Sequence, residues 1–163
     1  MKKNQKGFTL VELLAVIVIL AVIILIAVNA VLPQMQKARK KSFADEGLAF
    51  AKAAETAYVD RQESGAKAFT ITDLRSHYVT KSDSNYKGCI VVTADGEGNI
   101  TGKTIYLASN KWMIVGKTSD GLGNNLDKDV KAYSTTAETD PWATAYDTCT
   151  QSGAPDVSTQ PTD

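Results

Sequence analysis

The hydrophobic residues of this chain are concentrated near its N-terminus. From Leu13 to Val28 every residue is Leu, Ala, Val or Ile, and the uncharged stretch continues to Leu32 with Asn29 as its one polar member. Residues 8–32 would form a helix about 37 Å long, which exceeds the roughly 30 Å hydrocarbon core of a bilayer. The pattern therefore predicts a membrane-spanning helix over residues 8–33.

A more polar helical segment follows Pro33. Helix-forming residues, many of them alanines, dominate from Gln34 to Glu63, and Ser64-Gly65 supplies a stop signal. Apolar and small side chains recur there at three- and four-residue steps, which places them on one stripe: Phe43, Gly47, Phe50, Ala54 and Ala57. We interpret residues 34–63 as an amphipathic continuation of the helix, whose stripe packs on a core rather than on a partner.

The remaining residues carry the signals of a small antiparallel sheet. Residues 89–93 are rich in β-branched side chains, 95–99 have turn composition and 100–107 alternate imperfectly, which together predict a hairpin. Residues 111–115 add a third strand. The sequence thus predicts a globular head over residues 64–151 and an α+β fold, in which the long N-terminal helix packs on the sheet.

Other parts of the head give weaker signals. Residues 130–133 are a candidate edge strand. Residues 66–87 have a mixed pattern, with a short helix expected to open at 72–75 and a loop at 82–85. The last segment, 152–163, has two prolines and almost no large apolar residue, so a mobile tail is expected.

Charge narrows the possible functions. The chain has 163 residues, with 18 basic and 18 acidic side chains. Its zero net charge gives no support for a nucleic-acid binder driven by phosphate neutralisation. A local basic run, Lys37–Lys41, follows the apolar stretch. We interpret it as a solvated or headgroup-facing collar, with contact to DNA as a weaker alternative.

The chain lacks the sequence signatures of common catalytic sites. No Walker loop, GxSxG elbow, HExxH helix or paired-cysteine redox motif is present. The single histidine, His77, has no nucleophile motif beside it and is interpreted as a structural side chain. We therefore expect a protein that is not an enzyme and uses no cofactor.

One acidic loop raises the question of a metal site. Asp120, Asn124, Asp127 and Asp129 surround two glycines, and calcium accepts such oxygen ligands in flexible loops. Their spacing differs from that of an EF-hand. Ordinary turn chemistry explains the same residues, so no metal is assigned and calcium stays an alternative.

The boundary before the apolar stretch carries the most specific motif. Three lysines lie within residues 1–6, and Glu12 stands at the edge of the apolar run. A conventional signal peptide would have an apolar core of about 7 to 15 residues and a small-x-small cleavage site, whereas this core is longer and continues into a polar helix. Glu12 is either an anion at a helix N-terminus in the headgroup region or part of a functional signal.

A resemblance to a known family rests on this boundary. The chain resembles the type IV pilin family in its prepilin signal, Lys6-Gly7-Phe8-Thr9-Leu10-Val11-Glu12, which is followed by about twenty apolar residues. The leader, residues 1–7, and the Phe start are similar to those of the type IVa subgroup. The resemblance implies cleavage between Gly7 and Phe8, N-methylation of Phe8, a role for Glu12 in filament assembly, and a lollipop-shaped fold of long helix and antiparallel head.

A departure from the family concerns the helix itself. Members often have a helix-kinking proline within the apolar span, where this chain has Asn29, and Pro33 comes slightly later. An interior proline removes one backbone hydrogen bond and clashes with the preceding turn. The helix is therefore expected to bend or melt between Asn29 and Pro33.

The resemblance also bears on the cysteines. It places the head outside the cytoplasm, where disulfides persist. The chain has two cysteines, so Cys89 to Cys149 is the only internal pairing. Many pilins link a C-terminal loop region in this way, although the separation here is wide. Two buried free thiols are the alternative.

These expectations combine into one functional hypothesis. The resemblance implies a type IV pilus subunit that resides in the cytoplasmic membrane and then polymerises through its N-terminal helix into a surface filament, serving adhesion, twitching motility, biofilm growth or DNA uptake. The implied partners are other copies of the chain, a prepilin peptidase, an assembly platform and cytoplasmic ATPases. The alternatives are a pseudopilin of a secretion or competence system and a monomeric single-span surface receptor.

Processing of the leader provides the first test. We expect the mature chain to begin at Phe8 with a methylated amine, because Gly7 is the small residue beside the junction and the basic leader stays on the cytoplasmic face. Intact-mass measurement of the surface protein checks this. A chain that starts after residue 32, as cleavage of a conventional signal would give, would contradict the resemblance.

Overall fold

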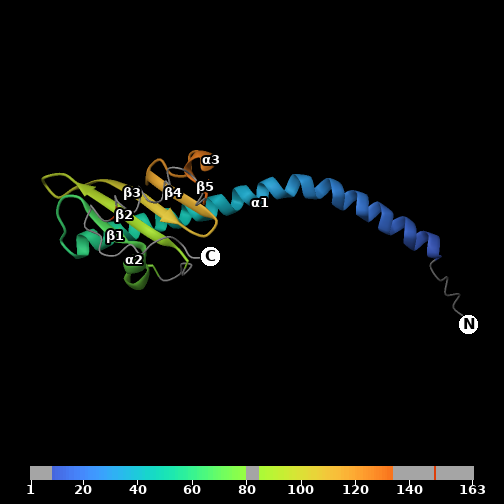
Figure 1. Cartoon of the computed structure of the whole chain (residues 1–163), viewed down its shortest axis with the longest axis horizontal. Helices are drawn as coiled ribbons and strands as arrows, with labels where there is room; N and C mark the ends of the chain where they lie inside the picture. The colour runs from blue at the N-terminus through green and yellow to red at the C-terminus, as the bar shows by residue number, and fades with distance from the viewer. Residues whose placement is uncertain (1–8, 80–84, 134–148, 150–163) are drawn as a thin grey trace, which may run out of the picture. The chain divides into compact units, whose positions relative to one another are not determined.

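The computed structural model describes residues 9–79, 85–133 and Cys149. It divides into two compact units, residues 1–38 and 39–163, each of which is described by itself. The described residues contain these elements (Figure 1): α1 (Leu10–Asp60), β1 (Lys67–Thr70), α2 (Ile71–His77), β2 (Lys87–Ala94), β3 (Ile100–Ala108), β4 (Trp112–Thr118), α3 (Leu126–Asp129) and β5 (Lys131–Ala132). The long N-terminal helix and the sheet confirm the expected α+β fold.

The strands form one antiparallel sheet whose spatial order is the order of the chain, β1-β2-β3-β4-β5. β2 and β3 form the expected hairpin, with Val91 opposite Thr104. Asp95 fixes the turn between them, because its carboxylate accepts hydrogen bonds from the backbone N–H groups of Glu97 and Asn99. β4 is the expected third strand, and β5 forms a shorter edge than the one expected at 130–133.

The second part of α1 packs on one face of this sheet. The stripe identified in the sequence is buried in the structure: Phe43, Gly47, Phe50, Ala54 and Ala57. The strands meet it with side chains of one face, among them Ile90, Ile105 and Ile114. The stripe therefore belongs to the core of the head, as its helical spacing indicated.

Gly47 lies at a tight contact between α1 and the sheet. A Cβ atom at this position would lie 3.2 Å from Ile114 Cδ1, 3.3 Å from Leu122 Cδ2 and 3.6 Å from Ile105 Cγ2. These distances leave no room for a larger side chain unless its neighbours move. The missing side chain of Gly47 thus lets the helix backbone approach β3 and β4.

The opposite face of the sheet carries a smaller cluster. Cys89 and Val91 of β2 lie on this face together with Cys149, whereas Ile90 and Val92 belong to the core beneath α1. A disulfide joins Cys89 to Cys149, with their Cα atoms 5.9 Å apart. The two residues are 60 positions apart in sequence, and closing a loop of that length stabilises a folded domain by about 4 kcal/mol in the chain-entropy treatment.

α1 ends at Asp60, three residues before the boundary expected at 63. The chain leaves the helix through Gln62, which takes a left-handed conformation with φ of 52°. The N–H of Gln62 donates to the carbonyl of Val59 and the N–H of Glu63 to that of Tyr58, which is the pattern of a Schellman cap. Sequence reasoning missed this stop because glycine is the usual residue at that position.

β1 is an element that the sequence pattern does not predict. It lies within the mixed segment 66–87, and of its four residues only Phe69 is buried. α2 follows directly and confirms a short helix there; the hydroxyl of Thr70 caps it by accepting a hydrogen bond from the backbone N–H of Asp73. The expected loop at 82–85, except for Asn85, and the expected tail at 152–163 lie outside the described residues.

Asp129 holds the segment between β4 and β5. Its buried carboxylate accepts hydrogen bonds at Oδ2 from the backbone N–H groups of Gly123 and Asn125, and Lys117 Nζ lies 3.1 Å from Oδ1. Burial raises the pKa of Asp129, but the hydrogen bonds from Lys117 and from the two backbone donors outweigh it and hold the pKa below its ordinary value of 3.8. The folded head therefore favours the ionised carboxylate.

Gly47→Leu tests the close packing of α1 on the sheet. The added side chain has to displace Ile114 and Leu122, and over-packing of this kind typically costs about 1 to 3 kcal/mol. We expect a lower melting temperature, measured by circular dichroism on the full chain in detergent. Ala49→Leu places the same side chain at an exposed position of α1 and should leave the melting temperature nearly unchanged. Equal effects of the two substitutions would contradict the tight contact.

Acid titration tests the role of Asp129. Because its folded pKa is lowered, its contribution to stability is fully present above the unfolded pKa, near 3.8, and is lost as the pH falls through the folded pKa. Asp129→Asn should lower the melting temperature at neutral pH, and its difference from the wild type should shrink below about pH 4. Asp120→Asn, at an exposed position, is the control. A difference that stays constant down to about pH 3 would argue against this account.

Candidate functional site: the start of the long helix

The N-terminal end of α1 is closed by reciprocal hydrogen bonds between Thr9 and Glu12. The backbone N–H of Thr9 donates to Glu12 Oε2 at 2.9 Å, and the Thr9 hydroxyl donates to the same oxygen at 3.0 Å. The backbone N–H of Glu12 in turn donates to the Thr9 hydroxyl at 3.3 Å. A Thr followed three residues later by a Glu in this arrangement is a capping box, which satisfies backbone donors that a helix start otherwise leaves open.

The sequence singled out Glu12 but not Thr9. The signal was present, because Thr-x-x-Glu before an apolar run is the sequence pattern of a capping box. The two residues at the junction, Gly7 and Phe8, lie outside the described residues. The structure thus places Glu12 in the first turn of α1, with its carboxylate turned back to the residue that precedes the helix.

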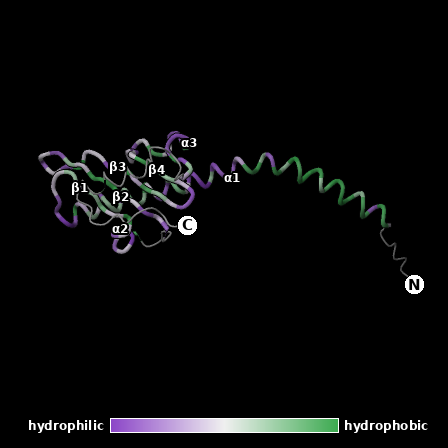
Figure 2. Tube along the Cα trace, in the orientation of Figure 1, coloured by the Kyte–Doolittle hydropathy of each residue, from purple (hydrophilic) through white to green (hydrophobic). Residues whose placement is uncertain are grey.

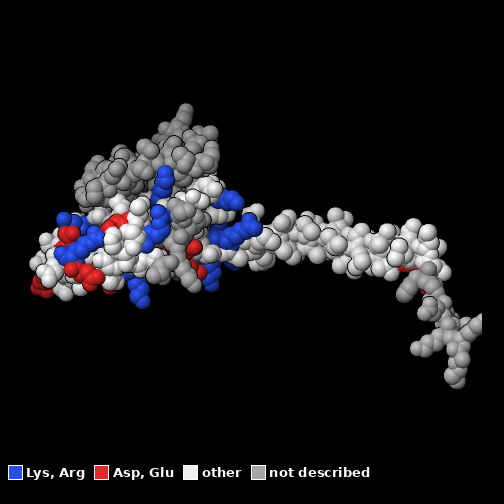
Figure 3. Space-filling model, turned by 90° about the horizontal axis from the view of Figure 1, so that it is seen from below, with Lys and Arg blue, Asp and Glu red and all other residues white. Residues whose placement is uncertain are grey.

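The apolar run of α1 is exposed along its length in the first unit. The exposed fraction of its large hydrophobic side chains ranges from 44% for Val28 to 79% for Leu10. Figure 2 shows these residues as the hydrophobic part of the helix, and Figure 3 shows this part as mostly uncharged surface. By length and composition the helix can cross a membrane. An apolar surface of this extent requires a cover of lipid or protein.

The helix remains helical through the region where a bend or melting was expected. α1 includes both Asn29 and Pro33 without interruption. Pro33 has no N–H to donate to the carbonyl of Asn29, so one hydrogen bond of the helical ladder is missing there. The side-chain amide of Asn29 donates to the carbonyl of Leu25 at 3.4 Å. Melting at 29–33 is therefore not observed, although the ladder is locally weakened.

The basic run behind the apolar stretch does not act as one uniform collar. Lys40 belongs to the head, because its Nζ lies 2.6 Å from Asp127 Oδ1 and 5.5 Å from the ring centre of Trp112. Lys41 is exposed, and Arg39 lines a cavity of the head. One cation of the run thus stabilises the head through an ion pair and a cation–π contact, while its neighbours in sequence face solvent or the cavity.

The acidic residues of the candidate calcium loop have separate partners. Asp127 pairs with a lysine of α1 and Asp129 with a lysine of β4, whereas Asp120 accepts a hydrogen bond from the Ser119 hydroxyl. Among the described residues, no group of three or more His, Cys, Asp or Glu side chains is placed to hold a metal ion. These contacts are those of ion pairs and turns.

His77 ends α2, and its contacts with the described residues are local. Its Nδ1 lies 2.6 Å from the Ser76 hydroxyl and 3.3 Å from Asp73 Oδ1. A catalytic relay needs the histidine to bridge Ser and Asp through its two different ring nitrogens. Both contacts here use the same nitrogen, so this trio does not have the geometry of such a relay.

Comparison with known proteins identifies the N-terminal segment. Residues 2–28 match the family described as the prokaryotic N-terminal methylation motif. No curated protein and no solved structure matches the chain. The matched segment contains the basic leader, the Gly7-Phe8 junction, Glu12 and most of the apolar run. In general terms, this motif implies processing by a peptidase and assembly into a filament of many subunits. The chain therefore carries a type IV prepilin-like signal, followed by a long apolar helix within an α+β fold of pilin-like architecture.

Proposed function

We propose that this chain is a structural subunit of a type IV pilus, which resides in the cytoplasmic membrane and then polymerises through α1 into a surface filament. The observation that carries the proposal is the exposed apolar run of α1. Lipid covers such a surface before assembly, and the same run of neighbouring copies covers it afterwards, because both surroundings are apolar. The subunit is passive, and separate cytoplasmic ATPases supply the energy of assembly.

Glu12 sets the register between neighbouring subunits in this proposal. In a filament core the carboxylate loses its water, and an ionised group then needs a positive partner. Lys2, Lys3 and Lys6 leave with the leader, so the nearest cation at this level is the amine of a neighbour's Phe8. Methylation leaves that amine charged. A Glu12 to Phe8 pair neutralises both groups and fixes the axial step between helices.

The capping box separates two possible roles of Glu12. Glutamine closes a capping box as glutamate does, so Glu12→Gln retains the helix cap and removes only the charge. Thr9→Ala has the opposite effect, because it removes the capping hydroxyl and leaves the carboxylate. The two substitutions therefore distinguish a need for negative charge from a need for a stable helix start.

We expect Glu12→Gln cells to insert and process the chain normally but to display few or no filaments. Removing one partner of a buried ion pair typically costs about 3 to 5 kcal/mol. Thr9→Ala, whose loss of a cap typically costs about 1 kcal/mol, should still assemble. Electron microscopy counts the filaments, and intact-mass measurement verifies processing of each variant. Wild-type numbers of filaments in Glu12→Gln cells would overturn the pairing mechanism.

A pseudopilin of a secretion or competence system is the second candidate. The match at residues 2–28 favours it equally, since that segment carries the shared signal and not the head. Deletion of the gene that encodes this chain distinguishes the pilus subunit from the pseudopilin. Loss of long surface filaments supports the pilus subunit, whereas loss of protein secretion or DNA uptake from cells that never display such filaments supports the pseudopilin.

A further inference from the structure

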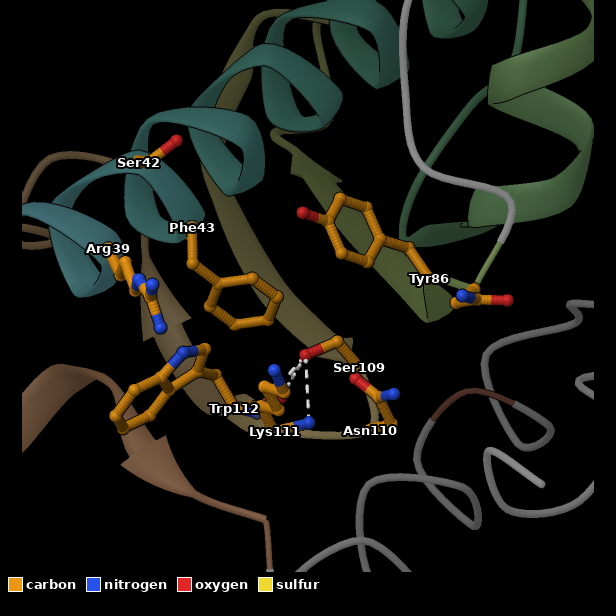
Figure 4. Close-up of a pocket in the computed structure, with 9 residues that line it drawn as sticks. Arg39, Ser42, Phe43, Tyr86, Ser109, Asn110, Lys111 and Trp112 are labelled. Carbon is orange, nitrogen blue, oxygen red and sulfur yellow. Dashed lines mark hydrogen bonds between the residues drawn. The ribbon is translucent and has the colours of Figure 1, made fainter. Parts of the chain in front are cut away.

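The head contains a cavity of about 360 Å³ that no sequence motif marks. It lies within the second unit, between α1, the residues just before β2 and the turn between β3 and β4 (Figure 4). Its volume falls within the range of about 300 to 1,000 Å³ that is typical of ligand sites. The cavity is therefore large enough to hold a small molecule or the polar end of a larger one.

Aromatic side chains form much of the wall. Phe43 is buried and packs edge-on against Tyr86, with ring centroids 5.5 Å apart. Trp112 lies on the side of Phe43 away from Tyr86 (Figure 4). Figure 4 shows the Arg39 side chain directed toward Trp112. The Ser109 hydroxyl accepts hydrogen bonds from the backbone N–H groups of Lys111 and Trp112, which fixes the turn that carries them.

Among the residues that the structure describes, the charged side chains of the wall are all positive. Of the nine described residues that line it, Arg39 and Lys111 are cationic and none is acidic. Uncharged polar side chains, such as Ser42 and Asn110, complete the wall. Two cations beside hydrogen-bonding groups suit a singly charged phosphate diester, and the aromatic rings suit an environment that is partly apolar and partly aqueous.

The position of the cavity in the chain indicates where it would encounter such a ligand. Arg39 follows Leu32, the last residue of the apolar run, by seven residues. Seven residues span at most about 25 Å even when fully extended. The cavity is therefore tied close to the surface of any membrane that the apolar run enters, where Trp, Tyr and basic side chains are typically found.

We propose that this cavity binds the phosphodiester headgroup of an anionic phospholipid, such as phosphatidylglycerol, while the subunit resides in the membrane. Arg39 and Lys111 hold the phosphate oxygens, and the uncharged polar side chains hydrogen-bond to the headgroup alcohol. The bound lipid tethers the head to the bilayer surface until the subunit leaves the lipid. The inference rests on the membrane-resident stage of the proposed function, but it does not require that filaments form.

Single-stranded nucleic acid fits these observations less well. Proteins that bind it combine stacked aromatic rings with a basic groove that follows several phosphates. Here the wall offers two cations, and the chain has no net positive charge. Two cations can hold the oxygens of one phosphate group, not those of a chain of phosphates.

Fluorescence of Trp112 tests the proposal in the full chain. Trp112 and Trp142 are its two tryptophans, so a Trp142→Phe background in neutral detergent micelles leaves Trp112 as the reporter. We expect short-chain phosphatidylglycerol to change its emission saturably and short-chain phosphatidylcholine not to. Arg39→Gln with Lys111→Gln should weaken the phosphatidylglycerol response roughly tenfold or more, since a hydrogen bond to a charged group typically contributes about that factor.

A matched control removes two other positive charges. Lys41→Gln with Lys52→Gln changes two exposed positions of α1 outside the cavity wall and should leave the response unchanged. Thermal unfolding verifies that both double variants are folded. Equal weakening in the two double variants, or an equal response to phosphatidylcholine, would overturn the proposal.

Two further ligands identify the source of any phosphate response. Inorganic phosphate that binds as tightly as phosphatidylglycerol would overturn the headgroup assignment in favour of a free-anion site. An oligothymidine that gives a saturable response where the lipid gives none would assign the cavity to nucleic acid instead. The filament counts on Glu12→Gln cells are independent of all these measurements, so failure of the lipid site and failure of the pilus proposal are distinguishable.

Discussion

The apolar surface of the first part of α1 must always be covered by lipid or protein. Large side chains are exposed there on all sides of the helix, and each square ångström of apolar surface left in water costs roughly 25 cal/mol. The second part of the same helix instead fills the core of the head. Lipid, or the apolar surface of another protein chain, can cover it.

The two parts of α1 differ in their residues because they pack against different surroundings. The first part has branched apolar side chains around its whole circumference, which suits lipid and helix neighbours on every side. The second part has one stripe of small and aromatic residues, and at Gly47 the missing side chain lets the backbone approach the sheet. One continuous helix thus joins an apolar segment that can contact neighbours on every side to a segment that packs on a single sheet.

Sequence patterns predicted the features that repeat or that depend on strong local chemistry. The apolar run, the helical stripe, the hairpin at 89–107 and the strand at 111–115 each carry a periodicity or a turn composition. β1 is too short to show alternation, and the cap that ends α1 depends on Gln62, a residue type that seldom takes a left-handed conformation. The Thr9 cap could have been found from its spacing to Glu12.

The cavity of the head was beyond sequence reasoning for a different reason. Arg39, Tyr86 and Lys111 come from three segments that are far apart along the chain. Their meeting depends on the register of the strands and on how α1 lies on the sheet, neither of which a linear pattern specifies. The same holds for the pairing of Lys40 with Asp127 across 87 residues.

The order of the strands has a kinetic consequence. Every strand of the described sheet pairs with its neighbours in sequence, so no crossover between strands that are distant in the chain has to be closed during folding. The helical stripe precedes the strands of the described sheet in the chain. It is therefore already present for each strand to pack on when that strand has been synthesised. All five strands lie before Cys149 in the chain. The disulfide can therefore close only after every strand of the described sheet has been synthesised.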